Sequence, residues 1–349
     1  MSKALWPRNA WYQAAWSHEI GEKPLARTLL NQDLVIYRDV SGTAHILEDR
    51  CCHRGLPLSR GRIVKAGLEC GYHGLIFNGC GACIVIPGQD SVPPQMQVRG
   101  FSVIERQGII WVWMGEKVPD ESLLVDFAWH DNPKEWPRME QYYPIRCDYR
   151  LLIDNLMDLT HIPYVHRSTI GSNNPSEHTS PEVESRQVPR GAWFRRWMKR
   201  VTPPLAYQRC MGWSKDTKIH RWHDFTYLAP CSILQGTGAV LASEEPEEAR
   251  DRAGTLRFRI AHGIVPETEI SCHYFWSTAN GAMPESVEIT KKLFEQVDEA
   301  FREDLELLEA QQQALLQNPG NLHDTKHDKF RIMARKALEE LITAESAAS

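Results

Sequence analysis

The N-terminal third of the chain alternates apolar and polar positions in short runs that are broken by glycine. The runs LVIYRDVSGTAHIL, IFNGCGACIVIPG and FSVIERQGIIWVWMG are rich in β-branched and aromatic residues. Such runs are typical of half-buried strands joined by tight turns, so we expect a β-rich module from Leu34 to about Gly115. The pattern weakens at GEKVPDESLL. We therefore place a domain boundary near Pro119 and expect domains at residues 1–119 and 120–349.

The second part of the chain mixes helical and strand patterns. YRLLIDNLMDLTHIPYVH has apolar residues at helical spacing, whereas KIHRWHDFTYLAP, TLRFRIAHGIV and ISCHYFWSTA are typical of strands. Residues 285–341 are expected to be helical, with an interruption at NPGN. The polar, turn-rich segment RSTIGSNNPSEHTSPEVESRQVPRG predicts a long loop or a partly disordered stretch. The predicted fold class is α+β, an all-β domain followed by an antiparallel sheet flanked by helices.

Composition excludes several classes of protein. The chain has 349 residues, of which 42% are hydrophobic and 24% charged, with a formal net charge of −5. No basic stripe suggests nucleic-acid binding, and no apolar run of about 18 residues predicts a membrane span. The N-terminus lacks the apolar core of a signal peptide, so we expect a cytoplasmic protein. Nine cysteines, an odd number, then favour reduced thiols and metal ligands over a disulfide framework.

Two mixed Cys-His pairs lie in CCHRGLPLSRGRIVKAGLECGYHG, as Cys51-x-His53 and Cys70-x-x-His73. A Rieske [2Fe-2S] cluster needs two thiolates on one iron and two imidazoles on the other, which is the stoichiometry seen here. A closed Cys₂His₂ zinc site is the alternative. The cluster is favoured because each loop supplies one Cys and one His. Three further cysteines near these loops fit turn and strand roles: Cys52, Cys80 and Cys83.

A second group of ligand-type residues occurs in DNLMDLTHIPYVH. On a continuous helix, Asp154, Asp158 and His161 would share one face. Pro163 should disturb that helix and let His166 turn toward the same point. Two histidines and a carboxylate are the ligands of the facial triad that binds iron(II). Two unrelated histidines on an amphipathic helix are the alternative, and spacing alone favours neither.

A further carboxylate for this group can come from KKLFEQVDEAFREDLELLEAQQQ. Asp304 falls on an apolar stripe at helical spacing, whereas Glu303 and Glu306 should point elsewhere. A carboxylate on a buried face needs a strong partner, either a metal or an ion pair near Arg302.

The segments CCHRGLPLSRG, CGYHGLIFNGCGACIVIPGQ, IWVWMG, CDYRLLIDNLMDLTHIPYVH and FREDLELLEAQQQALL resemble the Rieske non-haem iron oxygenase α-subunits. The resemblance is closest to the vanillate O-demethylase branch, with the dicamba and toluenesulfonate monooxygenases as near relatives. It implies a catalytic domain of the helix-grip type. It also implies two iron cofactors, a [2Fe-2S] cluster bound by Cys51, His53, Cys70 and His73, and a mononuclear Fe(II) bound by His161, His166 and Asp304.

The resemblance implies roles for three more residues. Asp158 would carry electrons from the Rieske centre of a neighbouring subunit to the iron, and Asn155 would lie near the iron. His262 resembles a substrate-contacting histidine, although a histidine on a strand is more often structural. The loop from about Ser172 to Arg195 and the segment GNLHDTKHDKFRIMARKAL depart from the vanillate enzymes, which leaves the substrate open.

The function implied is oxygen activation with externally supplied electrons. No dinucleotide-binding motif is present, so the electrons must come from a separate protein. The resemblance implies that this protein is a flavin and [2Fe-2S] reductase that uses NAD(P)H, and that the chain forms a homotrimer. Our main hypothesis is O-demethylation of a small, vanillate-like methoxylated aromatic acid with O₂ and release of formaldehyde. The alternatives are hydroxylation of an aryl methyl or N-methyl group, a Rieske electron carrier, and a zinc-stabilised binding module.

Overall fold

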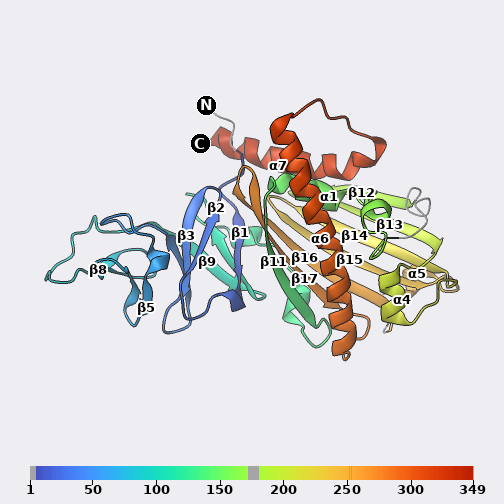
Figure 1. Cartoon of the computed structure of the whole chain (residues 1–349), viewed down its shortest axis with the longest axis horizontal. Coiled ribbons are helices and arrows are strands. Elements are labelled where there is room, and N and C mark those ends of the chain that lie inside the picture. Colours follow the sequence, from blue (N-terminus) through green and yellow to red (C-terminus); the bar gives the residue numbers. More distant parts are fainter. Residues whose placement is uncertain (1–4, 172–180, 251, 253, 349) are drawn as a thin grey trace. The chain divides into compact units, whose positions relative to one another are not determined.

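The computed structural model describes residues 5–171, 181–250, 252 and 254–348 (Figure 1). The chain forms two compact units. One consists of Trp6–Leu124 together with Val265–Thr268, and the other contains Val125–Ile264 and Glu269–Ser349. The chain thus passes from the first unit to the second a few residues beyond Pro119. The short return to the first unit at Val265–Thr268 has no counterpart in the sequence pattern.

The first unit is all-β, as the sequence predicts. Its larger sheet is antiparallel, with the strand order β1-β10-β9-β4-β3-β2. The strands are β1 (Trp11–Trp16), β2 (Leu25–Leu29), β3 (Gln32–Arg38), β4 (Ala44–Glu48), β9 (Gly100–Arg106) and β10 (Ile109–Trp113). Every residue of β1 and β10 is buried, which accounts for the continuous apolar character of IIWVW.

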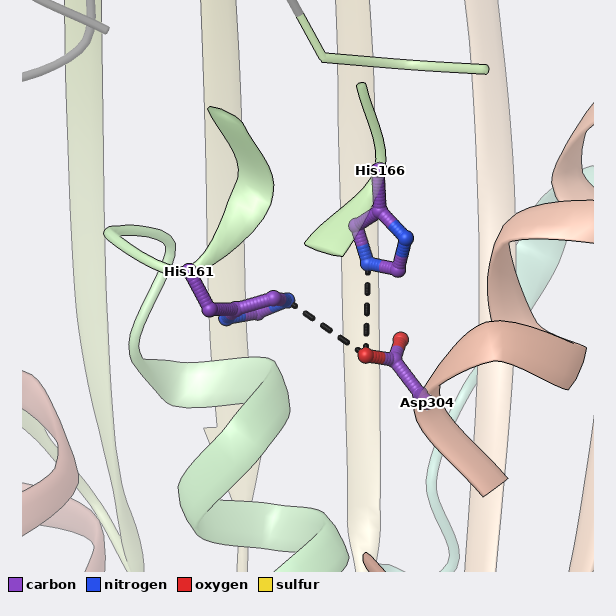
Figure 2. Close-up of side chains that lie close together, drawn as sticks. All are labelled: His161, His166 and Asp304. Carbon is purple, nitrogen blue, oxygen red and sulfur yellow. Dashed lines mark ion pairs between the residues drawn. The ribbon is translucent and has the colours of Figure 1, made fainter. Parts of the chain in front are cut away.

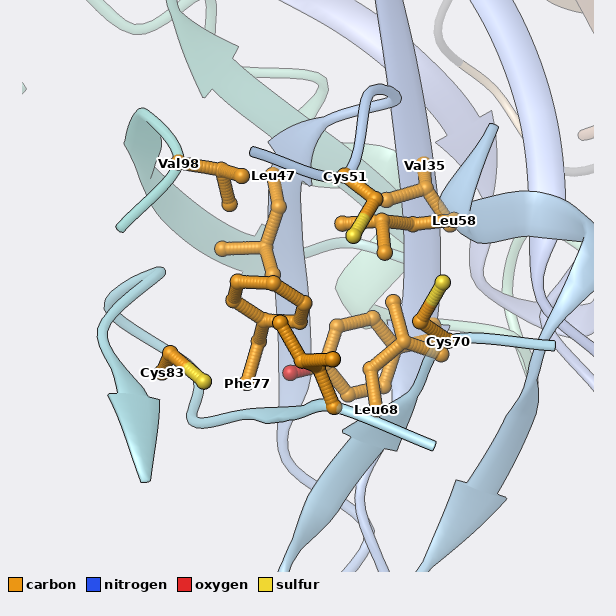
Figure 3. Packing of buried hydrophobic residues seen from close by; sticks show 11 residues of the cluster. Val35, Leu47, Cys51, Leu58, Leu68, Cys70, Phe77, Cys83 and Val98 are labelled. Atoms are coloured by element: carbon orange, nitrogen blue, oxygen red, sulfur yellow. The ribbon is translucent and has the colours of Figure 1, made fainter. Parts of the chain in front are cut away.

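A small four-stranded sheet in the same unit positions the Cys-His loops. It is made of β5 (Arg62–Val64), β6 (Gly67–Glu69), β7 (Ile76–Phe77) and β8 (Cys83–Val85). An apolar cluster that includes Leu58, Leu68 and Phe77 packs beneath the loops (Figure 3). Single 3₁₀ turns complete the unit: η1 (Ser17–Glu19), η2 (Leu58–Arg60) and η3 (Glu121–Leu123).

The second unit is built on a seven-stranded antiparallel sheet, with the order β11-β17-β16-β15-β14-β13-β12. Its strands are β11 (Arg138–Ile145), β12 (Glu182–Val188), β13 (Gly191–Val201), β14 (Ile219–Leu228), β15 (Ser232–Leu241), β16 (Leu256–Thr268) and β17 (Ser271–Asn280). Its helices are α1 (Tyr149–Met157), α2 (Ile162–Val165), α4 (Leu205–Met211), α5 (Pro246–Ala249), α6 (Val287–Gln317) and α7 (Lys329–Ala348), with 3₁₀ turns η4 (Ala128–Asp131) and η5 (Lys326–Asp328). The long helix α6 runs across the sheet against β17 and β11 (Figure 1).

The predicted α+β fold class is confirmed, including the helical C-terminal part interrupted after Gln317. The loop prediction is wrong where β12 and β13 form a hairpin, paired from Glu182–Trp197 to Val188–Gly191. β12 lies at the edge of the sheet and most of its residues are exposed. An edge strand can therefore be polar on both faces, and its composition is easily taken for a loop. Residues 172–180 of the predicted loop lie outside the described residues.

The helix expected to carry Asp154, Asp158 and His161 on one face is interrupted. α1 ends at Met157, and Asp158 is extended, with φ −119° and ψ 105°. The Asp158 carboxylate accepts hydrogen bonds from the backbone N–H and the hydroxyl of Thr160, a local turn that competes with the helix. Pro163 is the second residue of α2 and lies in its first turn, where a proline removes no helical hydrogen bond, so it does not disturb a helix. The shared face was therefore a wrong prediction.

Asp154 lies away from the two histidines, in an ion pair with α7. Its two carboxylate oxygens accept from Arg335 Nε and Nη2 at 2.8 and 2.7 Å, and Arg331 lies 3.8 Å away. The pair joins α1 to α7, so the role of Asp154 is structural. In the part of the chain that the structure describes, no helix is long and apolar enough to cross a membrane.

Candidate metal sites

The two Cys-His loops of the first unit have the same backbone design. In the first loop, the Cys51 amide donates to the Leu56 carbonyl and the Gly55 amide donates to the Cys51 carbonyl. In the second loop, the Cys70 amide donates to the Leu75 carbonyl and the Gly74 amide donates to the Cys70 carbonyl. Each glycine has a positive φ, 72° at Gly55 and 70° at Gly74, which favours glycine. Each loop thus turns sharply and presents one Cys and one His.

The two sulfur ligands and the two imidazoles have opposite environments. Cys51 and Cys70 are buried members of the apolar cluster (Figure 3), whereas His53 and His73 are exposed, with ring centroids 4.6 Å apart. Burial raises the pKa of the Cys51 thiol to about 11. A free thiol here would stay protonated at neutral pH, so bonding to iron is what would hold it as a thiolate.

The spacing of these four residues disfavours a closed zinc site. Two ligands of one zinc ion lie no more than about 4.6 Å apart, because Zn–S and Zn–N bonds are at most about 2.3 Å. Among the described residues, three or more donor groups meet within 4.8 Å at His161, His166 and Asp304, and not at the Cys-His loops. A two-iron cluster, which separates its ligands over two metals, fits the loops better.

The remaining cysteines of this region behave as predicted. Cys52 is exposed beside the first loop, Cys80 is exposed in the turn before β8, and Cys83 is a buried residue of β8. Its thiol donates to the carbonyl of Val85 at 3.4 Å. Cys80 and Cys83 therefore have ordinary turn and strand positions.

The second unit brings two histidines and one carboxylate together (Figure 2). His161 immediately precedes α2, His166 immediately follows it, and Asp304 is a residue of α6. Asp304 Oδ1 lies 3.2 Å from His166 Nε2 and 3.6 Å from His161 Nε2. Donors at these separations can bind one first-row metal ion, since metal–donor bonds of about 2.1 Å allow separations up to about 4.2 Å. The set has the composition of the two-histidine, one-carboxylate triad.

Each histidine is held through its second ring nitrogen. His161 Nδ1 donates to the backbone carbonyl of Asp158 at 2.6 Å, and His166 Nδ1 donates to Glu303 Oε2 at 2.7 Å. Both contacts leave the Nε2 lone pair aimed at the shared point. Glu303 was expected to point elsewhere, which was wrong, because its side chain is long enough to reach His166 from the flank of α6. Asp158 holds the imidazole through its backbone rather than its carboxylate.

The protonation preferences of the two histidines differ. Burial lowers the pKa of His161, which favours the neutral ring that a metal needs. Burial also lowers the pKa of His166, but the carboxylates of Asp304 and Glu303 outweigh this effect and raise it above its ordinary value. The two acids thus give the site a negative charge that a metal cation can neutralise.

Asn155 lies beside the donor set, in contact with Asp304. Its Nδ2 donates to Asp304 Oδ1 at 3.0 Å, while its buried Oδ1 has no hydrogen-bond partner. A buried amide oxygen without a partner is costly. A metal ion or a metal-bound water beside Asp304 would satisfy it, so the residues present fit a bound cation.

A small, largely apolar cavity of about 50 Å³ opens beside the donor set. Leu156, Ile162, Phe225, Val297 and Phe301 supply much of its apolar wall. Ligand pockets usually measure about 300–1,000 Å³, so this space holds a few waters and must widen to admit an aromatic ring.

His262 lies behind this cavity. Its Nδ1 is 2.8 Å from the Tyr274 hydroxyl and its Nε2 is 3.0 Å from Gln235 Oε1, and the residue is fully buried. Burial lowers its pKa to about 3. Gln235 lines the cavity, and His262 contacts the cavity wall through its hydrogen bond to Gln235.

Two family models match the chain. The Rieske [2Fe-2S] domain model matches residues 10–99, and the vanillate O-demethylase oxygenase C-terminal domain model matches residues 145–344. The two matches fall on the two units and include the Cys-His loops and the His-His-Asp set respectively.

Similar proteins cover nearly the whole chain. A vanillate O-demethylase oxygenase subunit of Pseudomonas sp. (strain HR199 / DSM 7063) is 36% identical, over 99% of this chain and 97% of its own length. A toluene-4-sulfonate monooxygenase system iron-sulfur subunit of Comamonas testosteroni is 34% identical, over 97% of this chain and 98% of its own length. The crystal structure of dicamba monooxygenase bound to 3,6-dichlorosalicylic acid superposes with a TM-score of 0.89 at 30% identity, covering 97% of this chain and 98% of that one.

Proposed function

Because the chain belongs to the Rieske non-haem iron oxygenases, with a [2Fe-2S] cluster and a mononuclear iron as cofactors, we propose that it demethylates a methoxylated aromatic acid. The predicted family and enzyme class are confirmed by the comparisons. The alternatives of an electron carrier and a zinc-stabilised module are set aside, because the oxygenase catalytic domain is present.

We assign the cluster to Cys51, His53, Cys70 and His73, and the mononuclear iron to His161, His166 and Asp304. The matched loops and the separation of buried sulfurs from exposed imidazoles support the first assignment. The close approach of three donors from α6 and the α1–α2 segment supports the second. When bound, the cluster supplies single electrons and the iron supplies dioxygen activation.

The protein groups around the iron site have separate tasks. Glu303 and the backbone of Asp158 fix the tautomers of His166 and His161, so that each presents an unprotonated Nε2. Asn155 orients the Asp304 carboxylate through its amide. The apolar wall of the cavity gives an aromatic ring a face to pack against, and a bound ring would displace the few waters that the cavity can hold. We assign the transfer of electrons between subunits to the Asp158 carboxylate.

The observation that carries the O-demethylase assignment is the similarity, at 36% identity over nearly the full length, to a vanillate O-demethylase oxygenase subunit. In the proposed reaction a methoxy carbon gains one oxygen atom of O₂. The other oxygen leaves as water, with two electrons and two protons supplied from NAD(P)H and solvent. The resulting hemiacetal separates into a phenol and formaldehyde. The electrons come through a separate flavin and [2Fe-2S] reductase, and the chain works as a homotrimer.

A turnover assay tests this proposal. Iron-loaded protein is combined with a vanillate-type reductase and NADH, and oxygen uptake, formaldehyde and product are followed for methoxybenzoates, methylbenzoates and toluenesulfonates. We expect formaldehyde and phenol in equal amounts for a methoxy acid, and none from Asp304→Ala, which should keep its Rieske absorbance. A hydroxymethyl product without formaldehyde would instead place the chain with the toluenesulfonate-type enzymes.

A further inference from the structure

One arginine projects into the iron-site cavity from the sheet. Arg221 lies on β14 and lines the same cavity as His161, His166 and Asp304. Only 3% of its surface is exposed. The three donors come from α6 and the α1–α2 segment, whereas Arg221 comes from a strand, so a molecule in the cavity would lie between them.

The guanidinium is held in place without being neutralised. Nε donates to the Tyr207 hydroxyl at 3.2 Å, Nη1 donates to the carbonyl of Ile170 at 3.0 Å, and the group stacks 4.8 Å from the centre of the Tyr207 ring. Within the described parts of the chain, Nη2 makes no hydrogen bond and no carboxylate lies within 4.0 Å of the guanidinium. By contrast, the buried Arg27 is paired with Glu19 at 2.9 Å.

A buried cation without a counter-charge is costly, and the cost is recovered when an anion binds. Arginine is suited to this task, because its planar group presents parallel N–H donors to a carboxylate or a sulfonate. Here three contacts fix the plane of the group in advance, which lowers the ordering cost of binding. The remaining cavity wall is mostly apolar and aromatic, as an aryl ring requires.

A second hollow, rich in arginine, lies on the opposite face of the same strand. Arg221, His223 and Phe225 line the iron-site cavity, while Trp222, Asp224 and Thr226 line the other hollow, as strand alternation requires. That hollow measures about 300 Å³ and is lined by five arginines, four tryptophans and Asp224. Asp224 already pairs with Arg195 and Arg250, at 2.8 and 3.1 Å. On the iron side, Arg221 faces the donor set with no carboxylate partner among the described residues.

We infer that Arg221 binds the anionic group of the aromatic substrate, a carboxylate or a sulfonate, and so limits the enzyme to aryl anions. The inference rests on the proposed function, because it places the oxidised carbon at the other end of the ring, toward His161, His166 and Asp304. The Tyr207 hydroxyl acts as a positioning group that holds the guanidinium toward the cavity.

A binding experiment tests the inference without turnover. Anaerobic holoenzyme is titrated calorimetrically with 4-methoxybenzoate, with toluene-4-sulfonate and with the neutral 4-methoxybenzamide. We expect wild-type protein to bind an anion more tightly than the amide. Arg221→Gln should weaken anion binding by about 10- to 100-fold, the usual effect of losing a charge-assisted hydrogen bond, and leave amide binding unchanged. Arg221→Lys should recover part of the loss, since it keeps the charge without the planar donor pair.

The controls separate this role from general damage and from the other hollow. Arg195→Gln should leave the preference for the anion intact, and loss of the preference in that variant would move the anion to the opposite face. Equal weakening of anion and amide in Arg221→Gln, or wild-type anion binding there, would overturn the inference. Iron content and Rieske absorbance are checked in each variant. If Arg221→Gln does not fold, Tyr207→Phe is used, and anion binding unchanged in that variant counts against the inference.

The two proposals can fail separately. Formaldehyde release in the turnover assay reports on O-demethylation, whereas the calorimetric preference for the anion reports on Arg221. Hydroxylation of a methyl group together with anion binding that depends on Arg221 would reject the first proposal and keep the second. Demethylation with no preference for the acid over the amide would do the opposite.

Discussion

Glu303 Oε2 lies 2.7 Å from His166 Nδ1, the ring nitrogen remote from Asp304. Glu303 and Asp304 are consecutive residues of α6, so one turn of helix supplies both a candidate ligand and the support of a second ligand. The Thr169 hydroxyl also donates to Glu303 Oε2, at 3.2 Å. The Glu303 carboxylate is therefore held in the position that keeps the proton of the neutral His166 ring on Nδ1, so that Nε2 is the atom that a metal can bind.

We predict that Glu303→Ala weakens mononuclear iron binding by about 10- to 100-fold, the usual cost of removing the carboxylate partner of a ligand histidine. Competition with a chelator measures the affinity. Glu306→Ala is the matched control, because Glu306 is an exposed residue of the same helix. Equal iron affinity in the two variants would show that Glu303 does not support His166.

The buried and exposed cysteines at the first loop allow a sharp test of the cluster ligands. Cys51→Ser should abolish the visible Rieske absorbance and the acid-labile sulfide, because a hydroxyl cannot replace the thiolate. Cys52→Ser should keep both, because Cys52 is exposed and off the ligand pattern. A protein that keeps its absorbance without Cys51 would contradict the assignment.

Asp158→Asn should leave both metals in place and slow electron transfer between them by roughly 10- to 100-fold. The iron is expected to stay because His161 is held by the backbone carbonyl of residue 158, and Asn still offers the oxygen that caps Thr160. Iron analysis and stopped-flow oxidation of the reduced cluster, with substrate and O₂, measure the two effects. Loss of iron would instead show that the carboxylate is chiefly structural.

Asp154→Ala should lower the free energy of unfolding by about 2 kcal/mol, since it removes two charge-assisted hydrogen bonds from Arg335. Iron content should not change, because Asp154 is not at the donor set. Chemical denaturation measures the loss, with Asp216→Ala, at an exposed position, as the control. Loss of iron with unchanged stability would instead show that Asp154 contributes to the metal site.

His262 should make the catalytic unit less stable in mild acid. In the unfolded chain its imidazole takes up a proton as pH falls below about 6.5, whereas the folded residue stays neutral down to a pKa of about 3. Unfolding is therefore favoured progressively between these values, by about 2 kcal/mol on going from pH 7 to pH 5. His262→Gln should reduce this dependence and the exposed His323→Gln should not. If the stability of His262→Gln depended on pH in the same way as that of the wild type, the lowered pKa of His262 would be contradicted.

The sequence predicted the parts of the site whose spacing is local. The two Cys-His loops and His161 with His166 are each encoded within a short segment, and the apolar stripe of α6 marks Asp304 as buried. Glu303 was missed because a position off the stripe was taken to face solvent, although its long side chain spans the gap. A carboxylate adjacent to a ligand is the signal that could have found it.

Two other features depend on tertiary structure. The burial of Arg221 follows from which face of β14 meets the helices, and RWHDF alternates without marking either face. The strand β12 was missed because an edge strand needs no apolar side. The end of α1 was, in contrast, readable from Asp158-Leu-Thr160, in which an aspartate precedes a hydroxyl residue by two positions.

The alternation of β14 ties two chemical environments to a single register. A shift of one residue would move Arg221 out of the iron-site cavity and bring Trp222 into it, and would break the pairing of Arg195 with Asp224 at the same time. Single substitutions at positions 221, 223 or 225 therefore change the iron-site cavity and leave the other face of β14 as it is. A one-residue insertion or deletion within the strand would exchange the side chains of both faces at once.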